Sequence, residues 1–148
     1  MNPKLRAWDP HKKKMVDDTE LVIWGGNIYQ GNRQKIFERI VEGKKGLIGY
    51  SIDDKYLMRS TGIKDKNGTE IFEGDVVRFS RLPGYPFDGF LNRVTWDEHN
   101  AAFKLVPLDK TWSDTYFSNF GGDTLKSLEV IGNVYEKDKL EEAINDTK

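Results

Sequence analysis

Three carboxylates lie close together in the middle of this chain: Glu70, Glu73 and Asp75 fall within six residues. Carboxylates at such spacing could coordinate a metal ion or act as a general acid and base. Either site needs further converging groups, and neither His11 nor His99 is spaced to complete this one. Because Gly-Asp sequences favour turns, we interpret the cluster as turn chemistry with solvated charges. A metal-dependent site through Glu73 and Asp75 is the alternative.

Other common catalytic signatures are missing from the sequence. There is no cysteine, which excludes disulfides, thiolate metal sites and cysteine nucleophiles. No nucleophile elbow of the form Gly-x-Ser-x-Gly, no Walker phosphate loop and no dinucleotide fingerprint occurs. We therefore expect no enzymatic activity, no cofactor and no bound metal.

Three basic residues could form one stripe on a sheet. Arg78 and Lys104 lie between apolar neighbours in predicted strands, and Arg93 precedes the alternating Val94 and Trp96, so the three basic side chains would point outward. If the three strands adjoin, these side chains line one face, and small barrels bind single-stranded nucleic acid through such stripes together with stacking aromatics. The alternative is a solvated face neutralised by nearby acids, which the formal net charge of −1 favours.

Two predicted loops carry a large amount of aromatic surface. The candidate interface residues in them are Tyr85 and Phe87 of loop 82–90, and Trp112, Tyr116 and Phe117 of loop 112–120. Loops this apolar are rarely left in contact with water. They either close the ends of the core or contact another subunit or a host protein, because aromatic residues are enriched at interfaces. The sequence leaves both alternatives open.

Short strands are the elements that would position these residues. Apolar runs and alternation predict strands at 4–9, 21–24, 27–30, 47–52, 56–58, 76–79, 90–96, 101–106 and 128–135. The Asn67-Gly68 pair predicts a hairpin turn over 65–68, because both residue types tolerate positive φ. Segment 32–42 fits either a short helix or a strand, and 139–145 fits one or two helical turns.

The composition of the chain limits its class. A length of 148 residues suffices for a buried core, and 18 aromatic residues with 14 glycines favour strands and tight turns. No apolar run reaches the roughly 20 residues that span a bilayer, and the N-terminus lacks the apolar core of a signal peptide. We therefore expect a soluble cytoplasmic protein without membrane contact.

The predicted fold is mainly β with minor α, in one domain of three parts. An N-terminal α+β lobe would span 1–57, a small five-strand barrel of SH3-like or OB-like type would span 58–136, and a short helical or disordered tail would span 137–148. The dense run of turn residues after residue 60 favours a structural role over a catalytic one.

Three blocks of the sequence resemble the YopX family of phage and prophage proteins. They are Lys4–Asp9, Thr61–Val77 and Val130–Glu136. The blocks occur in the order found in that family and extend over nearly the whole chain, and they are specific only in combination. The resemblance implies a mostly β protein encoded by a phage or an integrated prophage. It implies no activity, cofactor or site residues.

We therefore expect a non-enzymatic phage accessory protein that acts through protein contacts, as a homo-oligomer or with a host or phage partner. The alternative is a single-stranded nucleic-acid-binding module that uses Arg78, Arg93 and Lys104. The two hypotheses differ in salt dependence, because binding to phosphates releases counterions.

Overall fold

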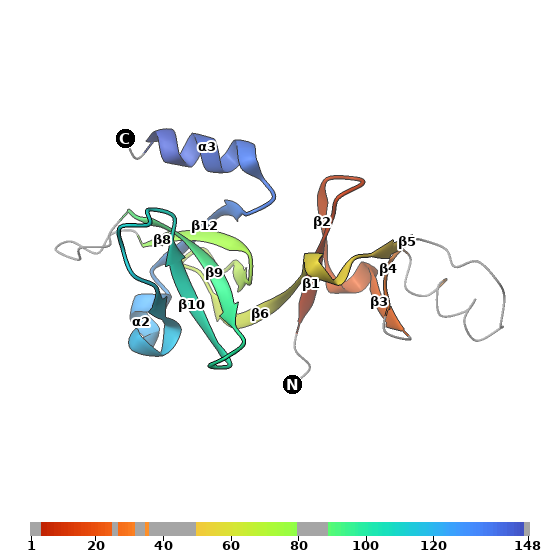
Figure 1. Ribbon diagram of the computed structural model, residues 1–148, viewed down its shortest axis with the longest axis horizontal. Helices are drawn as coiled ribbons and strands as arrows, with labels where there is room; N and C mark the ends of the chain where they lie inside the picture. The colour runs from red at the N-terminus through yellow and green to blue at the C-terminus, as the bar shows by residue number, and fades with distance from the viewer. Residues whose placement is uncertain (1–3, 25–26, 32–34, 36–49, 80–88, 147–148) are drawn as a thin grey trace. The chain divides into compact units, whose positions relative to one another are not determined.

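A computed structural model of the protein describes residues 4–24, 27–31, 35, 50–79 and 89–146. These residues form mainly strands, which confirms the predicted class (Figure 1). The chain divides into two compact units, Met1–Arg59 and Ser60–Lys148. The choice between helix and strand for 32–42 falls almost entirely outside the described residues.

The first unit is built from short antiparallel strands. These are β1 (Leu5–Asp9), β2 (Lys14–Val16), β3 (Leu21–Trp24), β4 (Asn27–Gln30), β5 (Tyr50–Ile52) and the beginning of β6 (Leu57–Lys64). β1 pairs with β2 and with the start of β6, while β4 pairs with β3 and β5. Short 3-10 helices precede β3 and β6, at Asp18–Glu20 and Asp54–Tyr56. The buried core draws on both sheets: it consists of Ala7, Val16, Leu21, Ile28 and Ile52.

The second unit contains a five-stranded antiparallel sheet in the order β11-β10-β9-β8-β12. Its strands are β8 (Asp75–Phe79), β9 (Leu91–Asp97), β10 (Ala102–Pro107), β11 (Thr115–Tyr116) and β12 (Leu128–Asn133). The end of β6 pairs with β7 (Glu70–Phe72). The two α-helices described in this unit are α2 (Gly122–Leu125) and α3 (Lys137–Asp146).

The segment 112–120 is more regular than the predicted loop. It contains β11, which pairs with β10, and a 3-10 helix at Phe117–Asn119. The prediction of an irregular loop was wrong here, because a two-residue strand and a single 3-10 turn leave no periodic pattern in the sequence.

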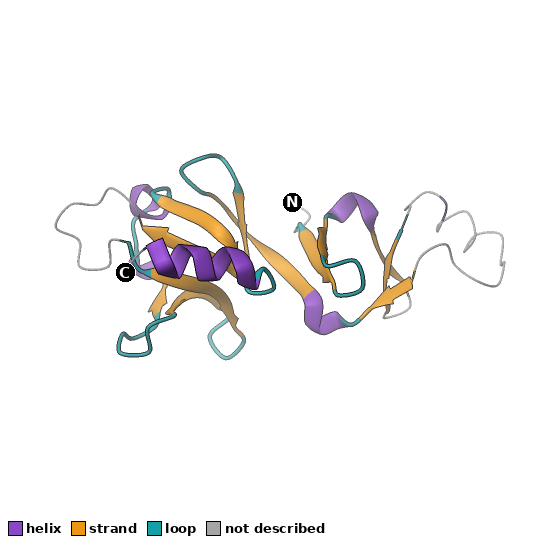
Figure 2. Ribbon diagram, turned by 90° about the horizontal axis from the view of Figure 1, so that it is seen from above, coloured by secondary structure: helices purple, strands orange, loops and turns teal. Residues whose placement is uncertain are grey.

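Alternate residues of the five-stranded sheet face one core. Its buried residues are Ile71, Val77, Phe79, Val94, Leu105, Phe117, Leu125 and Leu128. A smaller cluster lies on the other face of the sheet, where Val76 and Leu91 pack with Leu140 of α3. Figure 2 shows α3 lying across this face. The sheet of the second unit therefore buries apolar side chains on both faces.

The turn at Asp65 fastens two parts of the second unit. The Asp65 carboxylate accepts hydrogen bonds from the backbone amides of Asn67 and Thr69, both at 2.8 Å, and of Val130 in β12 at 3.0 Å. The Lys66 amide adds a bond of 2.9 Å to the Leu128 carbonyl. The hairpin turn predicted from Asn67-Gly68 is therefore present, and it also covers backbone groups of β12 that would otherwise lie at a sheet edge.

A second turn, Glu73-Gly74-Asp75, is tied to the strands around it. The Gly74 amide donates to the Val94 carbonyl at 2.8 Å, and the Gly74 carbonyl accepts from the Val134 amide at 2.9 Å. Gly74 has a φ of +88°, a conformation that favours glycine over residues with a Cβ. This explains why a glycine stands at the centre of the turn.

No helix within the described ranges is long and apolar enough to cross a bilayer. The mainly β class follows directly from the strands above. The closed five-strand barrel of SH3-like or OB-like type stays a prediction, since the described sheet is open between β11 and β12 in its strand order.

We predict that Asp65→Ala lowers the free energy of unfolding by about 3 kcal/mol, because three backbone amides lose a charged acceptor. Urea denaturation followed by tryptophan fluorescence measures the change. The control is Glu98→Ala, which removes an exposed carboxylate from another turn and should change the stability by less than about 0.5 kcal/mol. Equal effects of the two substitutions would contradict this role for Asp65.

Candidate functional site

Of the three residues in the acidic cluster Glu70, Glu73 and Asp75, Asp75 helps to hold the fold together. Asp75 is buried, and its Oδ2 accepts a hydrogen bond of 2.8 Å from the Phe72 amide. In the part of the chain that the structure describes, no three His, Asp or Glu side chains are grouped to hold a metal ion. The alternative of a metal site through Glu73 and Asp75 therefore has no ligand set among these residues.

Aspartate is used repeatedly in this protein to close turns. In six places among the described residues, its carboxylate accepts a hydrogen bond from the backbone amide two residues further along: Asp9, Asp17, Asp53, Asp65, Asp97 and Asp109. The amides of His11 and His99 are donors in two of these turns. Both histidines are exposed there, as expected for turn residues. These carboxylates therefore have a structural task in closing turns.

The three predicted basic residues share one face of the five-stranded sheet. In the strand register, Arg93 lies opposite Val76 of β8 and Val106 of β10, and Lys104 lies opposite Thr95 of β9. Paired residues, and alternate residues along one strand, point to the same side of a sheet. Arg78, Arg93 and Lys104 therefore point to the same side of three adjoining strands.

Acidic side chains neutralise two of these three charges. Arg78 Nε lies 3.5 Å from Glu129 Oε2, and Lys104 Nζ lies 2.9 Å from Asp114 Oδ2. The hydrogen bond to Asp114 raises the pKa of Lys104. Arg93 is exposed, and its Nε donates to Thr95 Oγ1 at 3.3 Å. The face is therefore less positive than its three basic residues alone would make it.

Tyr116 joins a polar network at one end of this face. Its hydroxyl donates to Asp97 Oδ2, and Asn100 Nδ2 donates to the same carboxylate and to the Tyr116 hydroxyl, both at 3.0 Å. The bond from Tyr116, followed by that from Asn100, holds the pKa of Asp97 well below its usual range. The same bond raises the pKa of Tyr116. The polar end of this predicted interface residue is thus already engaged within its own unit.

The other predicted interface residues divide between core and surface. Phe117 is only 8% exposed and packs in the core beside Phe103, which favours the alternative that this segment closes the core. Its 3-10 helix turns the ring inward, which sequence periodicity does not reveal. Trp112 is 40% exposed. Tyr85 and Phe87 lie outside the described residues.

Trp112 is part of a small apolar surface, which we call the Trp112 patch and which consists of Phe90, Leu108 and Trp112. The ring centroids of Phe90 and Trp112 are 5.3 Å apart. Leu108 is 37% exposed, and its amide donates to the Leu91 carbonyl at 3.0 Å, next to Phe90 in the chain. Leu108 and Trp112 thus expose apolar surface, and Phe90 lies against the Trp112 ring.

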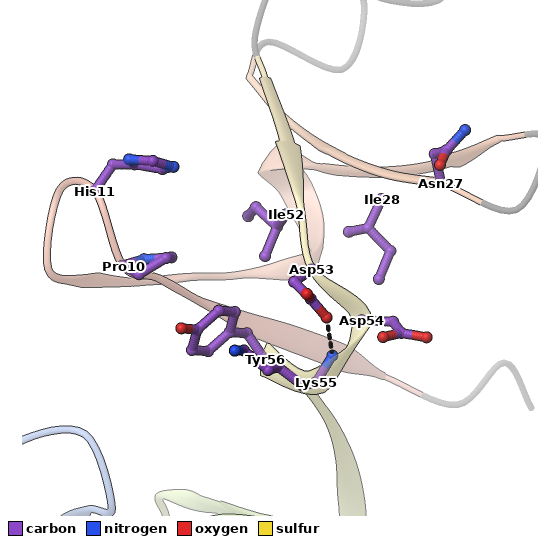
Figure 3. Close-up of a pocket in the computed structure, with 9 residues that line it drawn as sticks. All are labelled: Pro10, His11, Asn27, Ile28, Ile52, Asp53, Asp54, Lys55 and Tyr56. Atoms are coloured by element: carbon purple, nitrogen blue, oxygen red, sulfur yellow. Dashed lines mark hydrogen bonds between the residues drawn. The ribbon is translucent and has the colours of Figure 1, made fainter.

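A surface pocket of about 590 Å³ lies in the first unit (Figure 3). It is lined by Pro10 and His11 after β1, by Asn27 and Ile28 of β4, and by the segment Ile52–Tyr56 between β5 and β6. Sequence reasoning missed it because three separate segments meet there. The only signal in the sequence was the run of polar residues Asp53-Asp54-Lys55 directly after an apolar strand.

The chemistry of this pocket is mixed. Ile28 and Ile52 are buried beneath it, while charged groups of both signs stand at its rim. Asp53 accepts the Lys55 amide at 3.0 Å, and this bond lowers the pKa of Asp53 (Figure 3). Of the two aspartates that line the pocket, Asp53 therefore caps the 3-10 helix Asp54–Tyr56. The pocket has room for a small polar ligand, and its lining favours no particular charge.

We predict that Tyr116→Phe raises the pKa of Asp97 toward its ordinary value of about 3.9, because the largest cause of its depression is removed. An NMR titration of the side-chain carboxyl carbon measures the shift. A depressed pKa stabilises the fold above the unfolded-state pKa, and this contribution is lost as the pH falls through the folded-state value. The variant should therefore lose less stability than the wild type on acidification.

The control for this experiment is Tyr56→Phe in the first unit, which should leave the titration of Asp97 unchanged. If Asp97 titrates in Tyr116→Phe as it does in the wild type, the network does not control its ionisation.

Comparisons with known proteins agree with the family resemblance of the three sequence blocks Lys4–Asp9, Thr61–Val77 and Val130–Glu136. No curated protein matches the chain. One solved structure that it resembles is the crystal structure of protein EF1440 from Enterococcus faecalis, with a TM-score of 0.53 and 26% sequence identity over 95% of this chain and 98% of that one. A family model described as YopX protein matches residues 4–142. The chain therefore belongs to the YopX family.

Proposed function

We propose that this protein is a non-enzymatic phage or prophage accessory protein of the bacterial cytoplasm, which works by self-association. The Trp112 patch carries the proposal: Leu108 and Trp112 are 37% and 40% exposed, and Phe90 lies against the Trp112 ring. Among the described residues, Ile23 is the one other large hydrophobic side chain that is similarly exposed. Tryptophan anchors are characteristic of the residues that dominate binding energy at interfaces.

A second copy of the chain is the partner that suits this surface best. Interfaces between identical subunits are more apolar than transient ones, and the three members of the patch are apolar or aromatic. With a formal net charge of −1, two copies experience little mutual repulsion. A host or phage protein that bound the same patch would compete with self-association.

The use of the aspartates supports binding over catalysis. Six carboxylates accept backbone amides at turns, and the buried Asp75 accepts the Phe72 amide. A carboxylate that is fixed in this way is a poor general base, because proton transfer would break bonds that hold the fold. The phage setting is proposed from the family resemblance.

We also propose that the second unit is a small barrel of SH3-like or OB-like type. Its support is the five-stranded sheet together with the Asp65 turn, which bonds to Leu128 and Val130 of the edge strand β12. Such a scaffold presents the connections between its strands at its ends. The residues of the Trp112 patch lie in such connections, outside β9, β10 and β11.

Binding of single-stranded nucleic acid is the second candidate function. The observation in its favour is the shared face of Arg78, Arg93 and Lys104. The ion pairs with Glu129 and Asp114 oppose it, because phosphates would have to displace both carboxylates. Arg93 is the residue of the three on which this candidate mainly depends.

We predict that the protein is oligomeric at micromolar concentration and that the Leu108→Ala, Trp112→Ala double variant dissociates. Loss of an anchor worth about 2 kcal/mol weakens association about 30-fold. Sedimentation velocity over a concentration series measures this shift. The matched control is Ile23→Ala, which removes a side chain that is 52% exposed in the first unit and should leave association unchanged. A wild-type protein that sediments as a monomer throughout would remove the proposal.

We predict that any binding of labelled oligothymidine weakens steeply with salt and depends on Arg93. In Arg93→Ala the slope of log affinity against log salt should fall by about one, because one phosphate contact is lost. Fluorescence anisotropy at several salt concentrations measures the slope. Arg59→Ala, in the first unit, is the charge-matched control. Absence of binding at low salt would exclude this second candidate.

A further inference from the structure

A second surface pocket, of about 520 Å³, lies within the second unit between the end of β6 and the short helix α2. It is lined by Gly62, Ile63, Lys64, Asp65, Lys66, Gly122, Leu125 and Lys126. None of these residues belongs to the Trp112 patch. We call this pocket the lysine groove.

Aliphatic side chains and glycines form the floor of the lysine groove. Leu125 is a member of the core, and Ile63 packs against that core. A Cβ placed on Gly62 or Gly122 would meet no atom within 4 Å, so the space beside both glycines is open. At Gly62 the backbone has a φ of +77°, which keeps a glycine favoured at this point of the floor.

Side chains of β6 hold this part of the floor in place. Ser60 Oγ accepts the Gly62 amide at 3.0 Å, and Thr61 Oγ1 accepts the Ile63 amide at 3.2 Å. The Thr61 hydroxyl also donates to the Ile71 carbonyl of β7 at 2.8 Å. The irregular end of β6 is therefore fixed before any ligand arrives, which lowers the entropic cost of binding.

Three lysines stand at the rim of the lysine groove, and an acidic side chain pairs with one of them. Lys64, Lys66 and Lys126 stand around the floor. Asp65 is the only acidic residue in the lining, and both of its carboxylate oxygens already accept backbone amides. Of the nearby acids outside the lining, Glu129 lies 3.3 Å from Lys66, and Glu70 lies opposite Lys64 in the strand register. Lys126 has no such acid paired with it in the described contacts of the groove.

We propose that the lysine groove binds an acidic peptide segment in which an aliphatic side chain is flanked by carboxylates. The volume falls within the range of about 300–1,000 Å³ that is typical of ligand sites. Ile63 and Leu125 suit an aliphatic side chain, and the lysines suit carboxylates on either side of it. Lysine is a flexible point charge, so it accepts carboxylates in varied positions.

The composition of the lining distinguishes this occupant from nucleic acid. Single-stranded nucleic acids bind where aromatic rings stack on bases, and the residues that line the groove include no aromatic side chain. An extended acidic peptide needs only an apolar contact and positive charge. The peptide is a different partner from the second copy that binds at the Trp112 patch.

A binding assay on the full chain tests the proposal. The probe is a fluorescein-labelled peptide in which glutamate alternates with leucine, followed by fluorescence anisotropy. An all-glutamate peptide of equal length and a labelled oligothymidine serve as comparison probes. We expect the glutamate–leucine peptide to bind at least about tenfold more tightly than the all-glutamate peptide, since only the former fills the apolar floor. Tighter binding of oligothymidine through the same lysines would overturn the proposal.

Two variants separate the groove from general attraction by charge. Lys64→Ala with Lys126→Ala should weaken peptide binding about tenfold, whereas the charge-matched pair Lys110→Ala with Lys137→Ala, both in the same unit and outside the groove, should not. Gly122→Leu fills the floor without altering the charge and should abolish the preference for the leucine-containing peptide. Circular dichroism confirms that each variant is folded. A Gly122→Leu protein that keeps this preference would overturn the proposal.

Discussion

The Asp65 carboxylate joins backbone segments that lie 65 residues apart in the chain. One oxygen closes the turn that follows β6, and the other accepts the Val130 amide of β12. This single buried charge thus defines a hairpin and attaches it to the last strand of the sheet. A carboxylate suits the task because it offers several acceptor sites, and bonds from amides to a charged group are stronger than neutral ones. The position of Lys66, and with it one side of the lysine groove, depends on this anchor.

In this protein, the residues that maintain the fold are largely different from those that we propose to bind partners. Its aspartates are largely committed to turns, while two surfaces of the second unit carry chemistry that the fold does not use. The Trp112 patch exposes aromatic and aliphatic area, and the lysine groove exposes positive charge around an apolar floor. We propose both surfaces as sites of recognition. A scaffold of this kind is compatible with several partners that bind at separate places.

The sequence predicted those features that local chemistry determines. The Asn67-Gly68 turn, the Gly74-Asp75 turn and the inward alternation of Val77, Phe79 and Val94 all follow from short-range preferences. Features that depend on distant residues could not be predicted. The Arg78–Glu129 ion pair spans 51 residues, and both pockets collect side chains from separate segments. The sequence left open whether Phe117 is buried, because one 3-10 turn sets the direction of its side chain.

Helix α3 covers an apolar part of the five-stranded sheet. Leu140 covers Val76 and Leu91 on the outer face of the sheet, and a Cβ added to Gly132 of β12 would lie 3.5 Å from the Cβ of Lys139. A protease that cut the chain between β12 and this helix would leave the main core intact. It would also expose the apolar side chains of Val76 and Leu91, which lie on the same face of the sheet as Arg78 and Arg93. Such a shortened molecule would fold and then aggregate. Its precipitation in a truncation series would therefore indicate an exposed apolar surface and not the loss of the main core.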